Sequence, residues 1–385
     1  MRFIHIADWH LGRTLHGACL IDDQAHALDQ VIDLARDARP EAVLVCGDVY
    51  DRAIPSADAV KLLDEVLSRL ALDLGITTIL IAGNHDSSQR LGFASRVLAR
   101  GGIHVFGAVG REVESVILGD ESGLVHFYPL PYAEPALVRE RLDWERPLDH
   151  EEAMKIMVER ILALHPSGER SVMLSHVFVT GGLTADSERP LSIGGADQVA
   201  SSCFAGFDYV ALGHLHRPQK AGEEHIRYSG ALFKYSFSEA DQSKAVHLVE
   251  MDARGCCCVE AIPLSPRRDV RCVEGLLKDV LAGPGTGENA EDYVLVRLQD
   301  RGPILDVMGK LRKVYPNVLH VERPFFSSLT GEQQPRPDRT RLNDTELFQA
   351  FFREASGHDL SDEEAAAYES VVDELRRQER EAGGG

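Results

Sequence analysis

Short, continuous apolar runs recur along the chain, and five of them end at Asp, Asn or His residues. Such a run is typical of a buried strand in a parallel sheet. The clearest covers 42–46 and ends at Gly47 and Asp48. The other four cover 3–7, 78–82, 172–175 and 209–212. Because ligands bind outside the carboxyl ends of strands in an open α/β sheet, these runs predict one site centred on Asp48.

Between the runs, apolar residues recur at helical spacing. We expect helices over 22–38, 56–74 and 88–100, the second with Ser56 as its N-cap. The strand–helix–strand order predicts a sheet that begins parallel. Further strands are expected near 103–106, 113–118 and 124–128, further helices near 134–142 and 149–165, and antiparallel strands at 226–228, 245–250 and 256–262. The predicted fold is α/β (α+β), with two sheets packed face to face and helices outside.

The segment Pro263 to Arg268 indicates a domain boundary. Beyond it, the pattern predicts a small α/β module with strands at 270–272, 293–298 and 318–321 and helices at 273–281 and 304–314. A stretch rich in Pro, Ser, Gln and Arg then predicts a linker before two final helices. We therefore predict a main domain over 1–265, the module over 269–323, the linker over 324–341 and a helix–loop–helix over 342–382.

The two final helices carry capping-box pairs, Asn343 with Glu346 and Ser361 with Glu364. A helical pair this short cannot bury its apolar stripe on itself. It must dock on its own protein or on a partner, and the preceding linker favours a partner. Twelve acidic residues and four arginines between 343 and 382 give it −8 of the total formal charge of −20.

Composition narrows the function classes. A net charge of −20 argues against a passive, basic nucleic-acid coat, but it does not exclude an enzyme that meets phosphates through bound cations. The seven cysteines form no C-x-x-C pair, and we expect them to be reduced and mostly small core residues. The chain shows no leader-like start and no apolar run near the ~20 residues that span a membrane, which predicts a cytoplasmic location.

The polar residues at the five strand ends match the needs of a two-metal site. In chain order they read D-x-H, G-D-x-x-D, G-N-H-D, H and G-H-x-H, and they comprise Asp8, His10, Asp48, Asp51, Asn84, His85, Asp86, His176, His214 and His216. Such a site needs a bridging carboxylate and further oxygen or imidazole ligands. A lone D-x-H is more often chance than a ligand pair, but all five motifs at strand ends are not explained as solvated charges or core histidines.

This order of motifs resembles the signature of the calcineurin-like metallophosphoesterases. The resemblance implies a four-layer fold with two packed sheets between helices. It also implies two Mn²⁺ ions, with other divalent cations possible. Asp8, His10, Asp48 and His216 would hold one ion, and Asp48, Asn84, His176 and His214 would hold the other. His85 would contact the scissile phosphate and help protonate the leaving oxygen, with Asp86 orienting its ring. Some relatives carry histidine in place of Asp51, so the role of Asp51 is left open.

The phrase D-W-H-L-G at 8–12 and the three-part layout resemble, more narrowly, the nuclease subunits of bacterial double-strand-break repair complexes. This implies a hydrolase for DNA repair, recombination and replication, acting as exonuclease on double-stranded ends and endonuclease on hairpins or blocked ends. Two metal ions would activate its water. An SbcC-type ATPase would bind the helices at 342–382, with 269–323 as a capping domain. The family forms homodimers, for which the helices at 56–74 and 88–100 are candidates, and acts on DNA at the nucleoid.

Two other functions fit the motifs. A phosphoesterase for a small phosphodiester or monoester would be expected to lack the module after 269 and the helical tail, both of which are present. A non-catalytic scaffold would be expected to have lost metal ligands, and every position is filled. Because residues 1–342 are still acidic, DNA must be held locally. The candidates are Arg13, Arg52, Arg90 and Arg217.

Overall fold

The computed structural model describes residues 1–188, 198–302 and 304–324, and further along the chain residues 345, 348–349, 352, 359–368 and 370–372. The chain divides into two compact units, Met1–Val270 and Arg271–Gly385. Among the described residues, no helix is both long and apolar enough to cross a membrane.

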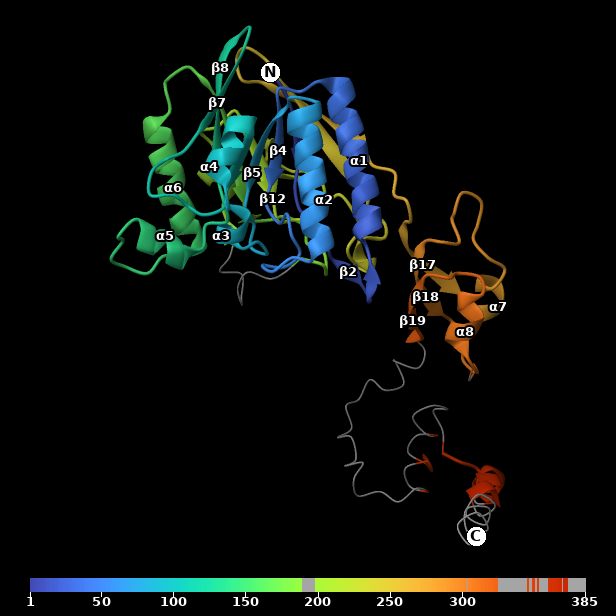
Figure 1. The fold of residues 1–385 in the computed structure, drawn as a ribbon. Coiled ribbons are helices and arrows are strands. Elements are labelled where there is room, and N and C mark those ends of the chain that lie inside the picture. Colours follow the sequence, from blue (N-terminus) through green and yellow to red (C-terminus); the bar gives the residue numbers. More distant parts are fainter. Residues whose placement is uncertain are drawn as a thin grey trace, which may run out of the picture. The chain divides into compact units, whose positions relative to one another are not determined.

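The first unit contains two six-stranded sheets (Figure 1). In the first sheet, β1 (Arg2–Ile6), β4 (Ala42–Cys46), β5 (Thr77–Ile81) and β6 (Ile103–Phe106) run parallel. On the other side of β1, β15 (Ala245–Met251) and then β16 (Cys257–Pro263) complete the sheet with antiparallel pairing. The prediction that the sheet begins parallel is confirmed.

The second sheet has the order β13-β14-β12-β9-β8-β7. Its strands are β7 (Val116–Asp120), β8 (Gly123–Leu130), β9 (Arg170–His176), β12 (Tyr209–Gly213), β13 (Gln219–Ala221) and β14 (Glu223–Tyr228). The expectation of one antiparallel set from 226 to 262 is wrong for β14. That strand pairs antiparallel with β13 rather than with β15, and it pairs in parallel with β12 in the register Val210 to Ile226, because the chain changes sheets between β14 and β15.

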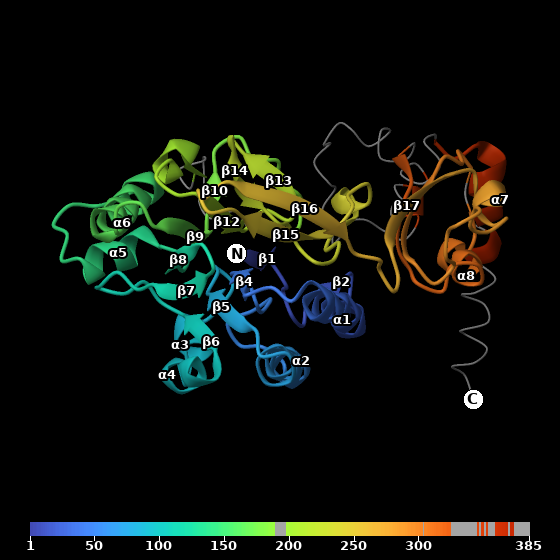
Figure 2. The same ribbon diagram turned by 90° about the horizontal axis from the view of Figure 1, so that it is seen from above.

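Alternating side chains of the strands build three hydrophobic layers. Phe3, Leu44 and Ile79 face Phe127 and Leu174 of the other sheet in the central layer. The opposite side of the first sheet packs on α1 (Ile21–Ala38) and α2 (Ala57–Ser68), and the second sheet packs on α5 (Pro135–Arg141) and α6 (His150–Leu164). Figure 2 shows α1 and α2 on the outer side of the first sheet. The predicted two packed sheets with helices outside are confirmed.

Two of the predicted helices are interrupted. The helix expected over 56–74 starts as predicted, with the Ser56 hydroxyl accepting from the Ala59 amide at 3.3 Å, but it ends in a π-helical turn, Arg69–Asp73. A single helix over 88–100 is wrong. The chain forms α3 (Ser88–Leu91), α4 (Ser95–Leu98) and a 3₁₀ turn, Ala99–Gly101, because Ala94 adopts a left-handed φ of 58°.

Several short elements were not expected from the sequence. β2 (Thr14–Leu15) pairs antiparallel with β3 (Ala18–Cys19), and β10 (Phe178–Val179) pairs in parallel with β11 (Gln198–Val199). Two 3₁₀ turns cover Ser201–Phe204 and Phe237–Glu239. Their hydrophobic patterns are too short to be recognised along the chain.

The second unit contains a three-stranded sheet in the order β17-β18-β19. Its elements are β17 (Val270–Gly275), α7 (Leu277–Val280), β18 (Tyr293–Leu298), α8 (Val307–Arg312) and β19 (Val318–Glu322). The helix expected over 273–281 is shorter than predicted because β17 continues to Gly275. Val280 and Leu311 of the helices pack on Val294, Val296 and Val318 of the sheet.

The predicted linker, and most of the two final helices, lie outside the described residues. Where the chain is described, residues 362–368 are helical. Ser361 and Glu364 form the predicted capping box: the Ser361 amide donates to the Glu364 carboxylate at 2.9 Å, and the Glu364 amide donates to the Ser361 hydroxyl at 3.3 Å. The Tyr368 ring stacks on Phe348 with centroids 3.9 Å apart. The Asn343–Glu346 pair lies outside the described residues.

The cysteines are free, as predicted, but the expectation that most lie in the core is wrong. Only Cys46 is buried, whereas Cys19, Cys256 and Cys258 are exposed and the others are intermediate. The run at 256–258 leads into β16. Because β16 is an edge strand, it has a neighbouring strand, β15, on one side only.

A buried histidine makes the stability of this fold sensitive to acid. Burial, reinforced by the charge of Arg227, lowers the pKa of His247 to about 4. Protonation therefore favours the unfolded chain, where the pKa is ~6.5, and stability falls by up to ~3 kcal/mol as the pH drops from ~6.5 to 4. Urea unfolding at several pH values should show a weaker pH dependence for His247→Gln than for the parent. Equal pH dependence would contradict this assignment.

Candidate metal centre

The strand ends bring the predicted site residues together at one edge of the two sheets. Asp8 and His10 follow β1, Asp48 follows β4, and Asn84 and His85 follow β5 of the first sheet. His176 ends β9, and His214 and His216 follow β12 of the second sheet. Except for Asn84 and His85, which are partly buried, these side chains are buried.

The backbone is strained at four of these positions. Asp8, His10, Asp48 and His214 have φ values of 53°, 45°, 49° and 110°. Residues other than glycine rarely adopt positive φ, and each instance costs ~1–3 kcal/mol, so such residues cluster where function requires them.

Glycines let the strand ends approach closely. A Cβ on Gly83 would lie 2.1 Å from the Asp48 carboxylate, and one on Gly213 would lie 1.8 Å from the Cys46 carbonyl. Among the glycines before Asp48, Asn84 and His214, only Gly47 has a positive φ, of 88°. At Gly83 and Gly213, glycine is needed because any side chain would overlap these neighbouring atoms.

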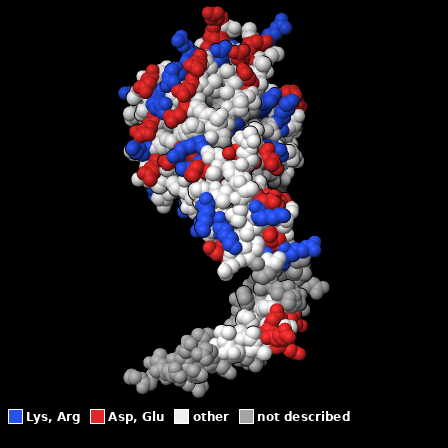
Figure 3. Space-filling view, turned by 90° about the vertical axis from the view of Figure 1, so that its right-hand side faces the viewer, with Lys and Arg blue, Asp and Glu red and all other residues white. Residues whose placement is uncertain are grey.

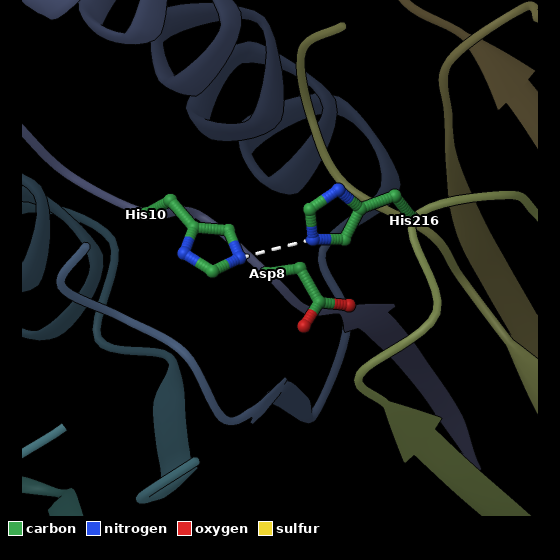
Figure 4. Close-up of side chains that lie close together, drawn as sticks. All are labelled: Asp8, His10 and His216. Atoms are coloured by element: carbon green, nitrogen blue, oxygen red, sulfur yellow. Dashed lines mark hydrogen bonds between the residues drawn. The ribbon is translucent and has the colours of Figure 1, made fainter. Parts of the chain in front are cut away.

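One group of side chains comprises Asp8, His10 and His216 (Figure 4). Each offers one possible ligand atom, and these atoms lie within 4.8 Å of one another. The Nε2 atoms of His10 and His216 are 3.0 Å apart. Three donors of this kind could hold a divalent cation.

A second group lies beside the first and shares Asp8 with it. Asp8, Asp48 and His176 also offer ligand atoms within 4.8 Å of one another. His176 Nε2 lies 2.9 Å from the Asn84 amide oxygen. The Oδ2 atom of Asp48 is 3.5 Å from His176 Nε2 and 3.6 Å from His10 Nε2, so this carboxylate lies between the two groups. The His214 ring lies 5.4 Å from that of His176, and its amide donates to the Asp8 carboxylate.

Burial sets the electrostatics of the centre. It raises the pKa of Asp8 well above its usual range, and it lowers the pKa of His10, His216 and, to about 3, His214. These imidazoles are therefore neutral and can offer a lone pair. His176 is the exception: burial lowers its pKa, but the charges of Asp48 and Asp8 outweigh burial and raise it to about 9. The two carboxyl groups, the imidazoles and the Asn84 amide oxygen form a donor set that suits Mn, Fe or Zn, so the residues present fit divalent cations.

Further residues hold the candidate ligands in place. The Ser187 hydroxyl lies 2.7 Å from His216 Nδ1 and donates to Glu239 at 2.5 Å, and Lys244 pairs with Glu239. The Gln24 amide donates to the carbonyls of Trp9 and His10 at 3.0 and 2.7 Å. Sequence reasoning missed these residues, because none belongs to a motif and they lie far along the chain from their partners.

The surroundings of His85 differ from the expectation. Its Nδ1 atom lies 2.8 Å from the carbonyl of Asp51, so main chain rather than Asp86 orients the ring. The Asp86 carboxylate instead accepts the amides of Val49, Tyr50 and Gly83 at 2.9–3.1 Å. Asp86 thus ties the loop after β5 to the loop after β4. His85 Nε2 points toward the centre, 4.0 Å from Asp48 Oδ2.

Two family models match parts of this chain, and several solved structures are similar to it. The family model for calcineurin-like phosphoesterases matches residues 1–218, and the SbcD_C model, described as the type 5 capsule protein repressor C-terminal domain, matches residues 266–356. Similar solved structures include a dimetal phosphatase from Danio rerio (14% identity, 69% of this chain and 96% of that chain, TM-score 0.43). Others are the phosphoesterase YfkN from Bacillus subtilis (14%, 83% and 97%, 0.37) and a 5′-nucleotidase precursor from Thermus thermophilus (17%, 69% and 54%, 0.37).

The first match covers more than half of the 385 residues, and its span includes every candidate ligand. The chain therefore belongs to the calcineurin-like phosphoesterase family, whose fold and metal-dependent hydrolase character it shares. The second match, in the C-terminal part, identifies it further as a metallophosphoesterase of the SbcD type.

Ser187 gives a test of the residues behind the ligands. Ser187→Ala removes the contact to His216 Nδ1, so the ring loses a fixed orientation and tautomer. We expect Mn²⁺ affinity to fall by ~10–100-fold, as for other residues that support metal ligands. Calorimetric titration with Mn²⁺ measures the affinity, and Ser56→Ala, at an exposed serine, is the control. An unchanged affinity would show that Ser187 does not support a ligand.

Proposed function

We propose that this protein is the metal-dependent DNA nuclease subunit of a complex with an SbcC-type ATPase. It acts as exonuclease on double-stranded ends and as endonuclease on hairpins or blocked ends. The observation that carries this proposal is a set of adjoining side-chain groups that could hold divalent cations, in a chain that also matches the SbcD_C family.

In this proposal, Asp8, His10, Asp48 and His216 hold one Mn²⁺, and Asp48, Asn84, His176 and His214 hold the other. The ions supply an activated water and stabilise charge on the phosphate. His85 faces the same space from the first sheet and contacts the scissile phosphate, where it delivers a proton to the leaving oxygen. Asp86 positions His85 by fixing the backbone of its loop.

The acidic chain must hold DNA through local basic groups, the cations or the partner. On the face drawn in Figure 3, Lys and Arg side chains alternate with Asp and Glu and form no continuous basic surface. Arg52, Arg90 and Arg217 are exposed, and Arg13 is only 16% exposed and lies against the centre. Four scattered arginines favour a nuclease that depends on its partner for tight DNA binding.

The helices of the first sheet offer a surface for the proposed homodimer. Val60 of α2 and Val97 of α4 are 46% and 71% exposed, and Phe93, between α3 and α4, is 80% exposed. Exposed apolar side chains mark an association surface where they form one patch, and we propose that these three contribute to such a patch. The acidic helix–loop–helix over 342–382 is proposed to bind the ATPase, and the module over 269–323 to act as a capping domain.

A nuclease assay on a hairpin substrate tests this function. The protein alone with Mn²⁺ is expected to nick or degrade DNA weakly, and the SbcC-type partner with ATP is expected to increase hairpin opening. Removing 343–385 should abolish binding of the partner without loss of bound metal. If the chain hydrolyses bis(4-nitrophenyl) phosphate but no DNA, with or without the partner, it is a phosphoesterase of another specificity.

A further inference from the structure

Each of three histidines of the centre has its Nδ1 atom held by a specific group. The Cys46 carbonyl holds His176 at 2.9 Å, the Ser187 hydroxyl holds His216 at 2.7 Å, and the Asp51 carbonyl holds His85 at 2.8 Å. His10 differs. Its Nδ1 atom is buried and has no hydrogen-bond partner in the part of the chain that the structure describes.

Which ring nitrogen of His10 carries the proton depends on the atom that faces His10 Nε2. Because Ser187 donates to Glu239, its hydroxyl accepts the proton of His216 Nδ1, which leaves a lone pair on His216 Nε2. The 3.0 Å contact between the two Nε2 atoms therefore places the His10 proton on Nε2. When His10 Nε2 binds a cation, this proton cannot remain there. His10 must then carry its proton on Nδ1, which needs an acceptor.

The acceptor within reach is the side chain of Asp51. Its Oδ1 atom lies 3.8 Å from His10 Nδ1, beyond a hydrogen bond but within a small side-chain movement of one. The carboxylate is held close to this place by Arg13, whose Nη1 atom lies 3.5 Å from the same oxygen. Arg13 is itself fixed, because its Nη2 atom donates to the Ser187 carbonyl at 2.6 Å and its guanidinium lies 5.1 Å over the Tyr235 ring.

We propose that Asp51 is the positioning residue of the metal ligand His10, accepting its Nδ1 proton when the cation is bound. This inference rests on the proposed assignment of His10 as a ligand. It gives Asp51 two roles in one centre. Its side chain orients a metal ligand, and its carbonyl orients His85, so the residue ties the metal centre to the proposed proton donor.

Three variants of the full-length chain separate the side-chain role from general effects. Asp51→Ala removes the acceptor but keeps the carbonyl that holds His85. Asp51→Asn keeps an acceptor oxygen and the shape of the side chain, so it guards against a folding defect. Arg52→Ala is the matched control, because Arg52 also contacts Asp51, at 3.5 Å, from a side chain that is 78% exposed.

The first readout is Mn²⁺ binding by calorimetry. Asp51→Ala should still bind two ions, but one of them ~10–100-fold more weakly than the parent does. Asp51→Asn should keep most of the parent's affinity, and Arg52→Ala should keep all of it. The second readout is the proton NMR spectrum with Co²⁺ in place of Mn²⁺. The N–H protons of metal-bound imidazoles are shifted outside the ordinary range there, and those that exchange with water vanish in D₂O.

Asp51→Ala should remove one shifted, exchangeable N–H signal, a different one from the signal that Ser187→Ala removes. Unchanged affinity with all signals present would overturn the proposal. A loss of one bound ion at saturating Mn²⁺ would also overturn it, because Asp51 would then be a ligand, a role that the grouping of His10, Asp51 and His85 ligand atoms would explain. Neither readout uses DNA, so failure of the nuclease function would leave this result interpretable.

Discussion

Asp48→Asn is expected to abolish binding of both metal ions and reduce phosphodiester hydrolysis to background. The Asp48 carboxylate lies 3.5 and 3.6 Å from imidazole nitrogens of the two ligand groups, and in the proposed assignment it is the ligand that both cations share. A neutral amide has one ligand oxygen and no charge to offset two divalent ions. Losing one bridging group therefore affects both positions rather than one.

The substitution should leave the fold intact, because an amide oxygen can still accept the His85 main-chain amide as Asp48 Oδ1 does at 2.9 Å. Metal content is measured by atomic emission after gel filtration in Mn²⁺, and activity with Mn²⁺ on linear and hairpin DNA. Asp58→Asn, an exposed carboxylate in the first turn of α2, is the control. Retention of one tightly bound ion would show that Asp48 does not bridge.

The sequence predicted that the candidate ligands meet at one sheet edge, and it could do so for a physical reason. Each candidate ligand follows an apolar run directly, and the run, the turn and the ligand are adjacent in the chain. Asp8 after β1 and Asp48 after β4 meet because both strands are parallel neighbours in the register Phe3 to Ala42. Their side chains must therefore emerge at the same edge.

The supporting residues could not be predicted in this way. Ser187 lies 29 residues before His216, and 52 residues separate it from Glu239, so no local sequence pattern links them. The orientation of His85 depends on a main-chain carbonyl, which has no signature in the amino-acid sequence. Pairing of β14 with β12 also depends on where the chain changes sheets, a property of the whole fold rather than of 223–228.

His85→Ala is the second substitution with a large expected effect. It should lower the rate of cleavage without changing metal binding. Neither ligand set proposed above includes His85, whose ring is 13% exposed and faces the centre with Nε2. Loss of a positioned acid typically lowers a rate by ~10²–10⁴-fold, and we expect a fall of this size in Mn²⁺-dependent cleavage. Mn²⁺ content should remain that of the parent.

The opposite responses of these two variants make the test sharp. If the centre is a cation pair with a separate proton donor, Asp48→Asn loses the ions and His85→Ala keeps them, although both lose activity. Added imidazole should restore part of the activity of His85→Ala, because the cavity left by the ring can admit it, and should not restore Asp48→Asn. Full nuclease activity in His85→Ala would remove His85 from the chemistry and leave proton delivery to water.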